Sequence, residues 1–549
     1  MNKTKQIIIV VAVFVLAIAS VGTIIGLIVN TGQMGDYSDG FNYTLSGSRA
    51  TITGYSGSDT EVVIPDKIKG NRVVAVANGA FDQKASAITS IVFESTFSGI
   101  ELGEEVFKDL TALTKVVLPS GLKEIPDDCF YGCKNLKEVY IPSGLTSIGE
   151  NAFYNCTALK FAYNSTSYGD DVDEEVFYLP QSLLEIGNSA FYGCTSLAGV
   201  SINKNLEKIG DSAFSGCTRL SNLIVAEDSE LTTIGESAFY GTILKSSEKS
   251  PLKFPNLKVI SAKAFSNVKT NFSYFEIPKS VTSVGENAFL SCTSLSKVNF
   301  AEGIEEISFG AGAFEDCTNL AYITLPEATT SIPERMFKGC SKLLYNNNFV
   351  IGKNIESIGD GAFAIYANST SYATRKNKIV VDEENINYTT IELEDFHKNE
   401  TATVYTHGLL ATADGKHIIA YFGDYDQDSK NSQGYTFRLL DQDGNDIEGI
   451  ESIGDYAFAG VDFEYIKLRK TIKTLGNYVF FGSSIEAMYI ESISWEWQET
   501  TFMKEDKGKP AVMVGILQST ATASEIDAFK ELLADAVLDS MTVTENQLP

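Results

Sequence analysis

The sequence predicts an α/β repeat solenoid, a stack of about 14 or more coils that share one hydrophobic core. Three observations predict it: a motif ending in Ala-Phe recurs, a short strand pattern follows most copies, and most copies are 22 to 26 residues apart. A repeat of that length cannot bury its apolar face alone, and stacking makes the core continuous. The anchoring phenylalanines are Phe81, Phe107, Phe130, Phe153, Phe191, Phe214, Phe239, Phe265, Phe289, Phe314, Phe337, Phe363, Phe458 and Phe480.

Composition favours an extensive core and an acidic surface. Of the 549 residues, 44% are hydrophobic and 11% aromatic, which argues against a chain that is disordered throughout. The formal net charge is −28. A surface this acidic repels the phosphates of nucleic acids and of anionic lipids. We therefore expect no nucleic-acid partner.

The N-terminus predicts a membrane segment. Residues Ile7 to Val29 carry no charge and are numerous enough to cross a hydrocarbon core of roughly 30 Å. Because Lys3 and Lys5 precede this run, the positive-inside rule makes residues 1–30 a cytoplasmic tail and transmembrane signal-anchor. The expected location is the cell membrane, single-pass, with the repeats extracellular. Cleavage of a signal peptide near Ala17-Ile18-Ala19 is the alternative, and the protein would then be secreted.

Each repeat joins a short strand to a turn. In Leu136–Pro142 and Leu320–Pro326, apolar residues stand at the first, fourth and sixth positions, so the last two share one face of a strand. The closing proline has no N–H and ends the strand. The turn piece, clear in Ile148–Thr157, carries Gly-x-x-Ala-Phe. Its small Ala lets the Phe pack inward over the strand.

These motifs resemble the BspA-type leucine-rich repeat, whose unit reads approximately L-x-x-I-G-x-x-A-F-x-x-C-x-x-L-x-x-V-x-I-P. The resemblance covers roughly residues 40 to 490. It implies a leucine-rich-repeat solenoid on a surface-exposed protein, either secreted or anchored. Members of this family have been associated with adhesion and with binding host or neighbour-cell proteins. The resemblance therefore implies that this chain binds another macromolecule.

The array departs from the regular spacing in two places. About 14 extra residues, acidic and aromatic, stand between Phe161 and Phe177. The stretch 364–447 separates two anchors that are too far apart for a loop. Within it, Tyr405 to Phe422 predicts a hairpin that turns at Asp414-Gly415. This hairpin resembles one interspersed in the same family, so the stretch is interpreted as a degenerate repeat.

The two ends of the array predict caps. The pieces Phe41–Leu45 and Ala50–Tyr55 are similar to the strand pair that often begins such arrays. At the other end, Ala511–Leu517 predicts a strand, and Ser524–Asp527 is a capping box that predicts a helix. The predicted domains are 1–30 tail and anchor, 31–75 N-terminal β cap, 76–363 leucine-rich repeats, 364–447 degenerate repeat and hairpin insertion, 448–492 final repeats, and 493–549 C-terminal α/β cap.

The eight cysteines are interpreted as buried core residues. Seven of them, all except Cys129, stand three residues after a phenylalanine anchor. A residue that recurs at one position of a stacked coil is most simply a small core residue with a free thiol. A few disulfides are the alternative in an exported chain, and Cys129 with Cys133 is then the best pair.

Residues for catalysis or metal binding are sparse. The three histidines, His397, His407 and His417, lack the spacing of a zinc site. The acidic stretches Asp424–Asp428 and Asp441–Asp446 lack the glycine and glutamate of a calcium-binding loop, so they predict solvated turns. We expect no metal, no cofactor and no enzyme. A hydrolase in the 364–447 insertion remains the alternative.

Binding is expected on the solvent-facing side of the strands. In the pattern L-x-x-V-x-I, the residues that flank the Val point away from the core. Tyrosine recurs there, and its broad ring with a polar tip suits protein recognition; a simple preference of Tyr for strands is the alternative. The predicted ligand-binding residues are Glu138, Tyr140, Tyr274, Glu276, Lys297, Tyr322, Thr324, Tyr465, Lys467 and Tyr489.

The predicted function is that of a cell-surface protein that binds extracellular macromolecules. The expected ligand is an extracellular protein or glycan, and the expected role is adhesion or interaction with another cell or a host. The array and the missing catalytic cluster motivate this prediction. A structural spacer or coat protein without a specific ligand is the alternative.

Overall fold

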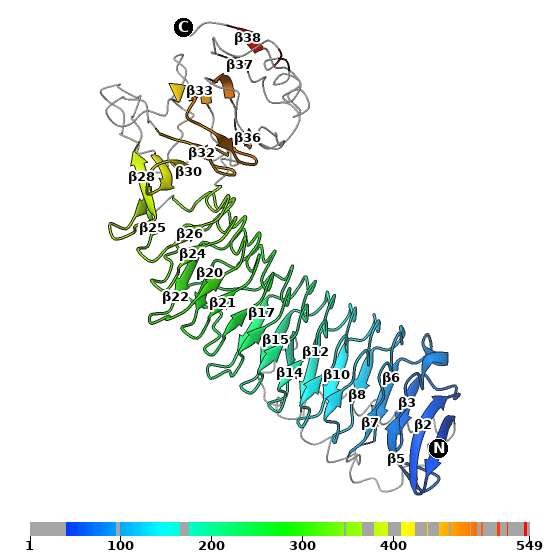
Figure 1. Ribbon diagram of the computed structural model, residues 1–549. Coiled ribbons are helices and arrows are strands. Elements are labelled where there is room, and N and C mark those ends of the chain that lie inside the picture. The colour runs from blue at the N-terminus through cyan, green and yellow to red at the C-terminus, as the bar shows by residue number, and fades with distance from the viewer. Residues whose placement is uncertain are drawn as a thin grey trace. The chain divides into compact units, whose positions relative to one another are not determined.

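Each repeat forms one coil in the computed structural model, with a strand on one side and a turn segment on the other (Figure 1). The coils belong to an N-terminal unit, residues 1–272, and a C-terminal unit, residues 273–549. The structure describes residues 40–94, 99–164, 175–344, 347–364, 378–392, 408–422, 436–437, 449–459, 463–481, 483, 485–490, 496–497, 513–516, 524, 527 and 543–545.

The described part of the N-terminal unit begins with a five-stranded sheet. Its strands are β1 (Phe41–Ser46), β2 (Arg49–Tyr55), β4 (Lys67–Ile68), β5 (Asn71–Val76) and β7 (Glu101–Leu102). Strands β1 and β2 form an antiparallel hairpin, and β5 pairs parallel with β2. The ring of Tyr55 lies 6.0 Å from that of Phe81, the first anchor, so this sheet adjoins the repeat core.

A parallel sheet of eight strands, called the broad sheet here, forms one side of the coils in the N-terminal unit. In spatial order its strands are β3 (Glu61–Ile64), β6 (Ser90–Phe93), β8 (Lys115–Val117), β10 (Glu138–Ile141), β12 (Phe161–Asn164), β13 (Val176–Tyr178), β15 (Gly199–Ile202) and β17 (Asn222–Val225). Neighbouring strands come from successive turns of the chain, and they lie side by side in Figure 1.

A second sheet of two-residue strands, the narrow sheet, forms where each coil turns back. In the N-terminal unit its strands are β9 (Glu124–Ile125), β11 (Ser147–Ile148), β14 (Glu185–Ile186), β16 (Lys208–Ile209), β18 (Thr233–Ile234) and β19 (Val259–Ile260). All pair parallel and in register. The second residue of each strand is buried, so the narrow sheet adds one isoleucine per coil to the core.

The C-terminal unit repeats this plan with shorter sheets. Its strands are β20 (Tyr274–Ile277), β21 (Ser283–Val284), β22 (Lys297–Phe300), β23 (Ser308–Phe309), β24 (Ser331–Ile332), β25 (Phe349–Ile351), β26 (Ser357–Ile358), β27 (Ile379–Val381), β28 (Tyr388–Glu392), β29 (Gly408–Thr412), β30 (His417–Phe422), β31 (Thr436–Phe437), β32 (Ser452–Ile453), β33 (Phe463–Leu468), β34 (Thr474–Leu475), β35 (Ile485–Ile490), β36 (Glu496–Trp497), β37 (Met513–Ile516) and β38 (Val543–Glu545). Strands β29 and β30 pair antiparallel around Asp414-Gly415, which confirms the predicted hairpin.

The phenylalanine anchors form a ladder of stacked rings inside the coils. From Phe107 to Phe265 in the N-terminal unit, successive ring centroids are 5.1 to 5.5 Å apart and the ring planes are within 19° of parallel. All fourteen anchors are buried. The chain is therefore a β-solenoid of about 14 turns, as the spacing of the anchors predicts.

The expectation of an α/β repeat is wrong, because the turn segments contain no α-helix. Among the described turn segments of the repeats, the helical element is η2 (Asp82–Lys84), a single turn of 3-10 helix. The backbone explains this: Asn151 and Asn155, on either side of Phe153, have φ of 52° and 56°, which interrupts a right-handed helix. Their N–H groups instead donate to carbonyl groups of the next coil at 2.9 and 2.7 Å.

The expected single-pass location in the cell membrane is also wrong. A helix that spans a bilayer needs about 20 apolar residues, and in the described ranges no helix has that length and composition. The run from Ile7 to Val29, on which the prediction rested, lies outside the described residues. Most of the helix predicted after the capping box lies outside the described residues; the two that are described there, Ser524 and Asp527, are both helical.

The cysteines confirm the interpretation as a buried ladder. All eight are free and buried, so Cys129 and Cys133 form no bridge. Six of them donate their thiol hydrogen to the carbonyl oxygen of the anchor one coil earlier, at 3.0 to 3.2 Å. Ser483 donates to the carbonyl of Phe458 from the equivalent position. Desolvation raises the pKa of the Cys156 and Cys194 thiols, and it raises that of Cys217 to about 12.

In many repeats a glycine stands three residues before the alanine of the anchor, as Gly359 does, and it lies where neighbouring coils approach closely. A Cβ on Gly359 would lie 2.4 Å from the backbone N of Glu334 in the preceding coil. Glycine at this position therefore permits the stacking. Gly352, seven residues earlier in the same coil, has no atom within 4 Å of where a Cβ would stand.

Replacing Gly359 by alanine should lower the stability of the C-terminal unit by about 1–3 kcal/mol, because the methyl group forces two coils apart. The measurement is the midpoint of chemical unfolding. Gly352→Ala is the matched control and should leave the midpoint within error of wild type. Equal effects of the two substitutions would contradict the close-approach explanation.

The thiols should be unreactive in the folded protein. At about pH 8.5, where an ordinary thiol is half ionised, burial keeps all eight out of reach of a reagent, and the raised pKa of thiols such as Cys156 and Cys217 keeps these protonated. A disulfide exchange reagent should then titrate none of the eight cysteines in native protein and all eight in denaturant. Rapid reaction of several thiols in the native state would show that the cysteines are accessible to solvent and would contradict their burial.

Candidate binding face

The outward-facing residues of the broad sheet form what we call the open face. In β10, Val139 is fully buried, so its neighbours Glu138 and Tyr140 face outward. The parallel register repeats this arrangement from strand to strand. The residues before the buried position form the first row, and the residues after it form the second row; both rows run across the strands.

Glu138 and Tyr140 are brought together with Lys115 on the neighbouring strand. Lys115 is the register partner of Glu138. Its ammonium Nζ lies 3.6 Å from Glu138 Oε2 and 4.9 Å from the centroid of the Tyr140 ring. All three side chains are half-buried. The ion pair and the cation–π contact hold Tyr140 against the sheet rather than leaving it to rotate freely.

Tyr274, Lys297 and Tyr322 form the corresponding group in the C-terminal unit. Tyr274 of β20 and Lys297 of β22 are register partners, and Tyr322 of the next coil pairs with Lys297 through an isolated parallel bridge. Lys297 Nζ lies 6.0 Å from the centroid of the Tyr274 ring, and Tyr322 is 42% exposed. This group therefore presents a lysine between two tyrosines on successive coils.

The other predicted residues are placed less closely together. Glu276 is half-buried and in register with Asn299, and Thr324 is exposed. Lys467 of β33 is the register partner of Tyr489 in β35, and Tyr465 stands two residues before Lys467 on the same strand. The side chains of these last three residues lie outside the described set.

The second row contains apolar residues that are absent from the predicted ligand-binding residues. Val63, Val92, Val117 and Tyr140 follow one another in register on β3, β6, β8 and β10, and all are half-buried. Tyr178, Ser201 and Ile224 are likewise in register on β13, β15 and β17, and Ile224 is 41% exposed. A comparison of the residue after the buried position in every repeat would have found this row in the sequence.

Of the histidines and acidic stretches considered for catalysis or metal binding, only His417 lies among the described residues. His417 and Ser452 are register partners on β30 and β32, with 2.5 Å between His417 Nδ1 and Ser452 Oγ, and desolvation lowers the pKa of His417. In the described part of the chain, no group of three or more His, Cys, Asp or Glu could hold a metal ion. His397, His407 and the stretches Asp424–Asp428 and Asp441–Asp446 lie outside the described residues.

Known proteins share the repeat. A family model described as BspA type leucine rich repeat region matches residues 74–178, 164–269, 258–392 and 445–518. Among solved structures, a leucine-rich repeat protein from Bacteroides ovatus is 25% identical over 59% of this chain and 90% of its own, with a TM-score of 0.36. A leucine rich cell surface protein from Faecalibacterium prausnitzii is 24% identical over 59% and 84%, with a TM-score of 0.37. The pneumococcal vaccine antigen PcpA is 16% identical over 93% and 98%, with a TM-score of 0.39. No curated protein matches the chain.

The contact between Lys115 and Tyr140 should be measurable as a coupling energy. In a double-mutant cycle of Lys115→Met and Tyr140→Leu, we expect the two effects on unfolding free energy to differ from additivity by about 0.5–1 kcal/mol. The pair Lys297 and Tyr274 is the comparison, and its longer distance predicts a smaller coupling. Additive effects at the closer pair would contradict the cation–π contact.

Proposed function

The chain belongs to the BspA-type leucine-rich repeat family, and from that premise we propose that it binds an extracellular macromolecule through the open face. The leucine-rich-repeat solenoid is a repeat scaffold whose stacked strands offer an extended surface. The proposed role is recognition, as in adhesion or in contact with another cell or a host. Catalysis is not part of the proposal.

The observation that carries this proposal is the composition of the second row. Six of its seven described residues, Val63, Val92, Val117, Tyr140, Tyr178 and Ile224, are apolar or aromatic, and none of the seven is charged. Cores of protein interfaces are depleted of charge and enriched in tyrosine. A row of mainly apolar side chains that faces solvent is typical of an interaction site.

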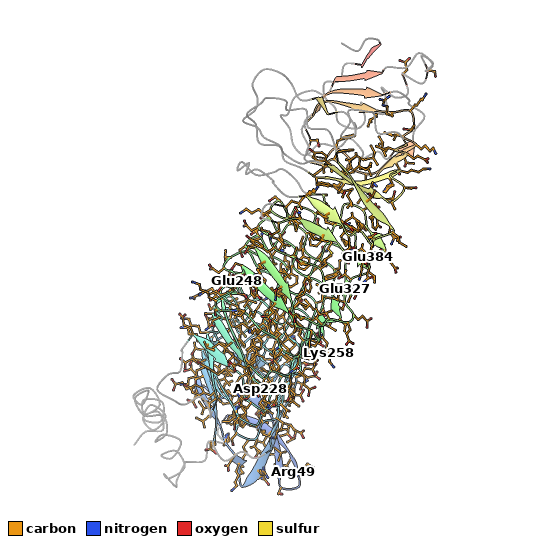
Figure 2. The ribbon with its side chains drawn as sticks, turned by 90° about the vertical axis from the view of Figure 1, so that its left-hand side faces the viewer. Arg49, Asp228, Glu248, Lys258, Glu327 and Glu384 are labelled. Atoms are coloured by element: carbon orange, nitrogen blue, oxygen red, sulfur yellow. The ribbon has the colours of Figure 1, made fainter. Side chains whose placement is uncertain are left out.

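The rest of the surface provides the contrast. The chain carries a net charge of −28. The six side chains labelled in Figure 2 are all charged and exposed: Arg49, Asp228, Glu248, Lys258, Glu327 and Glu384. A spacer or coat protein needs only a solvated surface of this kind. The uncharged second row has no role in such a protein, which favours binding.

A photo-crosslinking residue in place of Val117, in the second row, should form discrete adducts with a macromolecule from the surface of neighbouring cells. The same residue in place of Tyr240, which is 42% exposed on a turn segment, is the matched control and should form none. The readout is the mass shift of the full-length chain. Adducts from neither position, or equally from both, would favour the spacer and reject the open face.

A further inference from the structure

A ridge beside the open face is basic although the chain as a whole is acidic. Lys134, Lys137 and Lys160 are all exposed, and they stand in the segments that lead into β10 and β12. The segments belong to adjacent coils, since the Lys160 N–H donates to the Lys137 carbonyl at 3.2 Å. Thr157 Oγ1 likewise donates to the Lys134 carbonyl at 3.1 Å. We call these three residues the lysine ridge.

The ammonium groups of the lysine ridge have no ion-pair or hydrogen-bond partner among the residues that the structure describes. Lysines elsewhere in the same unit are paired across coils: Lys208 lies 2.8 Å from Glu185, and Lys204 lies 2.9 Å from Asp228. The acidic residue next to the ridge, Glu138, has Lys115 at 3.6 Å. Among the described residues the three ammonium groups are therefore unpaired. Glu175 aligns with Lys160 in the parallel register of β12 and β13, and it places one acidic residue beside that end of the ridge.

Local charges decide what such a ridge attracts. At physiological ionic strength the interaction between exposed charges is largely screened beyond about 8 Å. The net charge of −28 is spread over the whole chain, whereas the ridge residues fall within two adjacent coils. A group that contacts the ridge therefore meets positive charge, and an anionic group is favoured there.

The lysine ridge adjoins one end of the apolar part of the second row. Lys137 stands three residues before Tyr140, which is about 10 Å along an extended strand. From β10 the ridge continues to Lys160, before β12, whereas the second row continues in the other direction to Val117 on β8 and Val92 on β6. The surface thus offers a basic cluster next to the end of an apolar row, and one polypeptide segment that carries apolar and acidic side chains covers both.

We propose that the open face takes an acidic amphipathic segment of a partner protein. This rests on the proposed function and names the class of partner. The apolar side chains of the segment pack on Val92, Val117 and Tyr140, and its carboxylates pair with the lysine ridge. Lysine suits this role because its ammonium is a point charge on a flexible stem. Nucleic acids and sulfated glycans supply anionic groups but no aliphatic side chains for the second row.

The test uses the full chain and two fluorescent synthetic peptides with leucines on one helical face. One peptide carries glutamates on the other face, and the second carries lysines. Fluorescence anisotropy should show binding of the acidic peptide that weakens as salt is raised, with weaker binding of the basic peptide. A preference for the basic peptide would overturn the proposal.

Charge-neutralised variants locate the site. Lys134→Gln, Lys137→Gln and Lys160→Gln together should weaken binding of the acidic peptide about tenfold. The matched control is Lys245→Gln, Lys249→Gln and Lys253→Gln, which removes three exposed lysines elsewhere in the same unit. It should change affinity less than about twofold. Equal losses in the two triple variants would show attraction by net charge alone and would reject the ridge.

Competition, self-association and crosslinking measurements distinguish an acidic peptide from the other ligands that could bind the ridge. Heparin, a polyanion without aliphatic side chains, should compete poorly; displacement of the peptide at equal charge concentration would reassign the ridge to polyanions and overturn the proposal.

Concentration-dependent self-association that the ridge variant abolishes would assign the site to a second copy instead. If the ridge variant still forms the crosslinked adduct at position 117 with unchanged yield, the open face binds its ligand without the ridge. In that case this inference fails while the proposed function stands.

Discussion

The structure depends on the in-register stacking of one coil on the next. From Phe107 to Phe265 each coil places its phenylalanine ring on that of its neighbour at slightly more than 5 Å, as Phe130 and Phe153 do, and Cys156 of the neighbouring coil donates to the carbonyl of Phe130. The backbone on the turn side joins the same ladder, since Asn151 and Phe153 donate their N–H groups to the next coil. A slip of one residue would break all of these contacts together, because the side chains of a strand alternate between core and solvent.

The stacking also determines what can vary. Side chains at equivalent positions of successive coils contact one another. A residue type that packs well against itself can therefore recur at that position in several coils. On the turn side, Tyr131, Tyr154 and Tyr192 stack with ring centroids 4.8 and 4.7 Å apart, and Lys108 lies over the first ring. Where a glycine stands three residues before the alanine, as at Gly359, the choice of residue is narrower, because a Cβ there would meet the backbone of the preceding coil.

The outward rows of the broad sheet carry no such constraint from the core. The residue types at these positions are constrained by contact with solvent, by the side chains on neighbouring strands and by any ligand that binds the sheet. On the first row, lysine and glutamate pair across strands, as Lys115 and Glu138 do. The second row is apolar over most of its length. The difference between two rows on one sheet surface, built by the same backbone, is what distinguishes a recognition surface from a solvated one.

The sequence by itself determined the repeat, its anchors and the inward positions of the strands, because these follow from spacing and from alternation along a single chain. It also placed the buried cysteines, since one position relative to each anchor identifies them. Only the tertiary structure decided the turn side, where left-handed residues such as Asn151 replace the expected helix. The same holds for the candidate site: Lys115 and Tyr140 are 25 residues apart in the sequence, and their contact exists because parallel strands align them. Local patterns fix which way a side chain faces, but the neighbours that it meets are set by the register between coils.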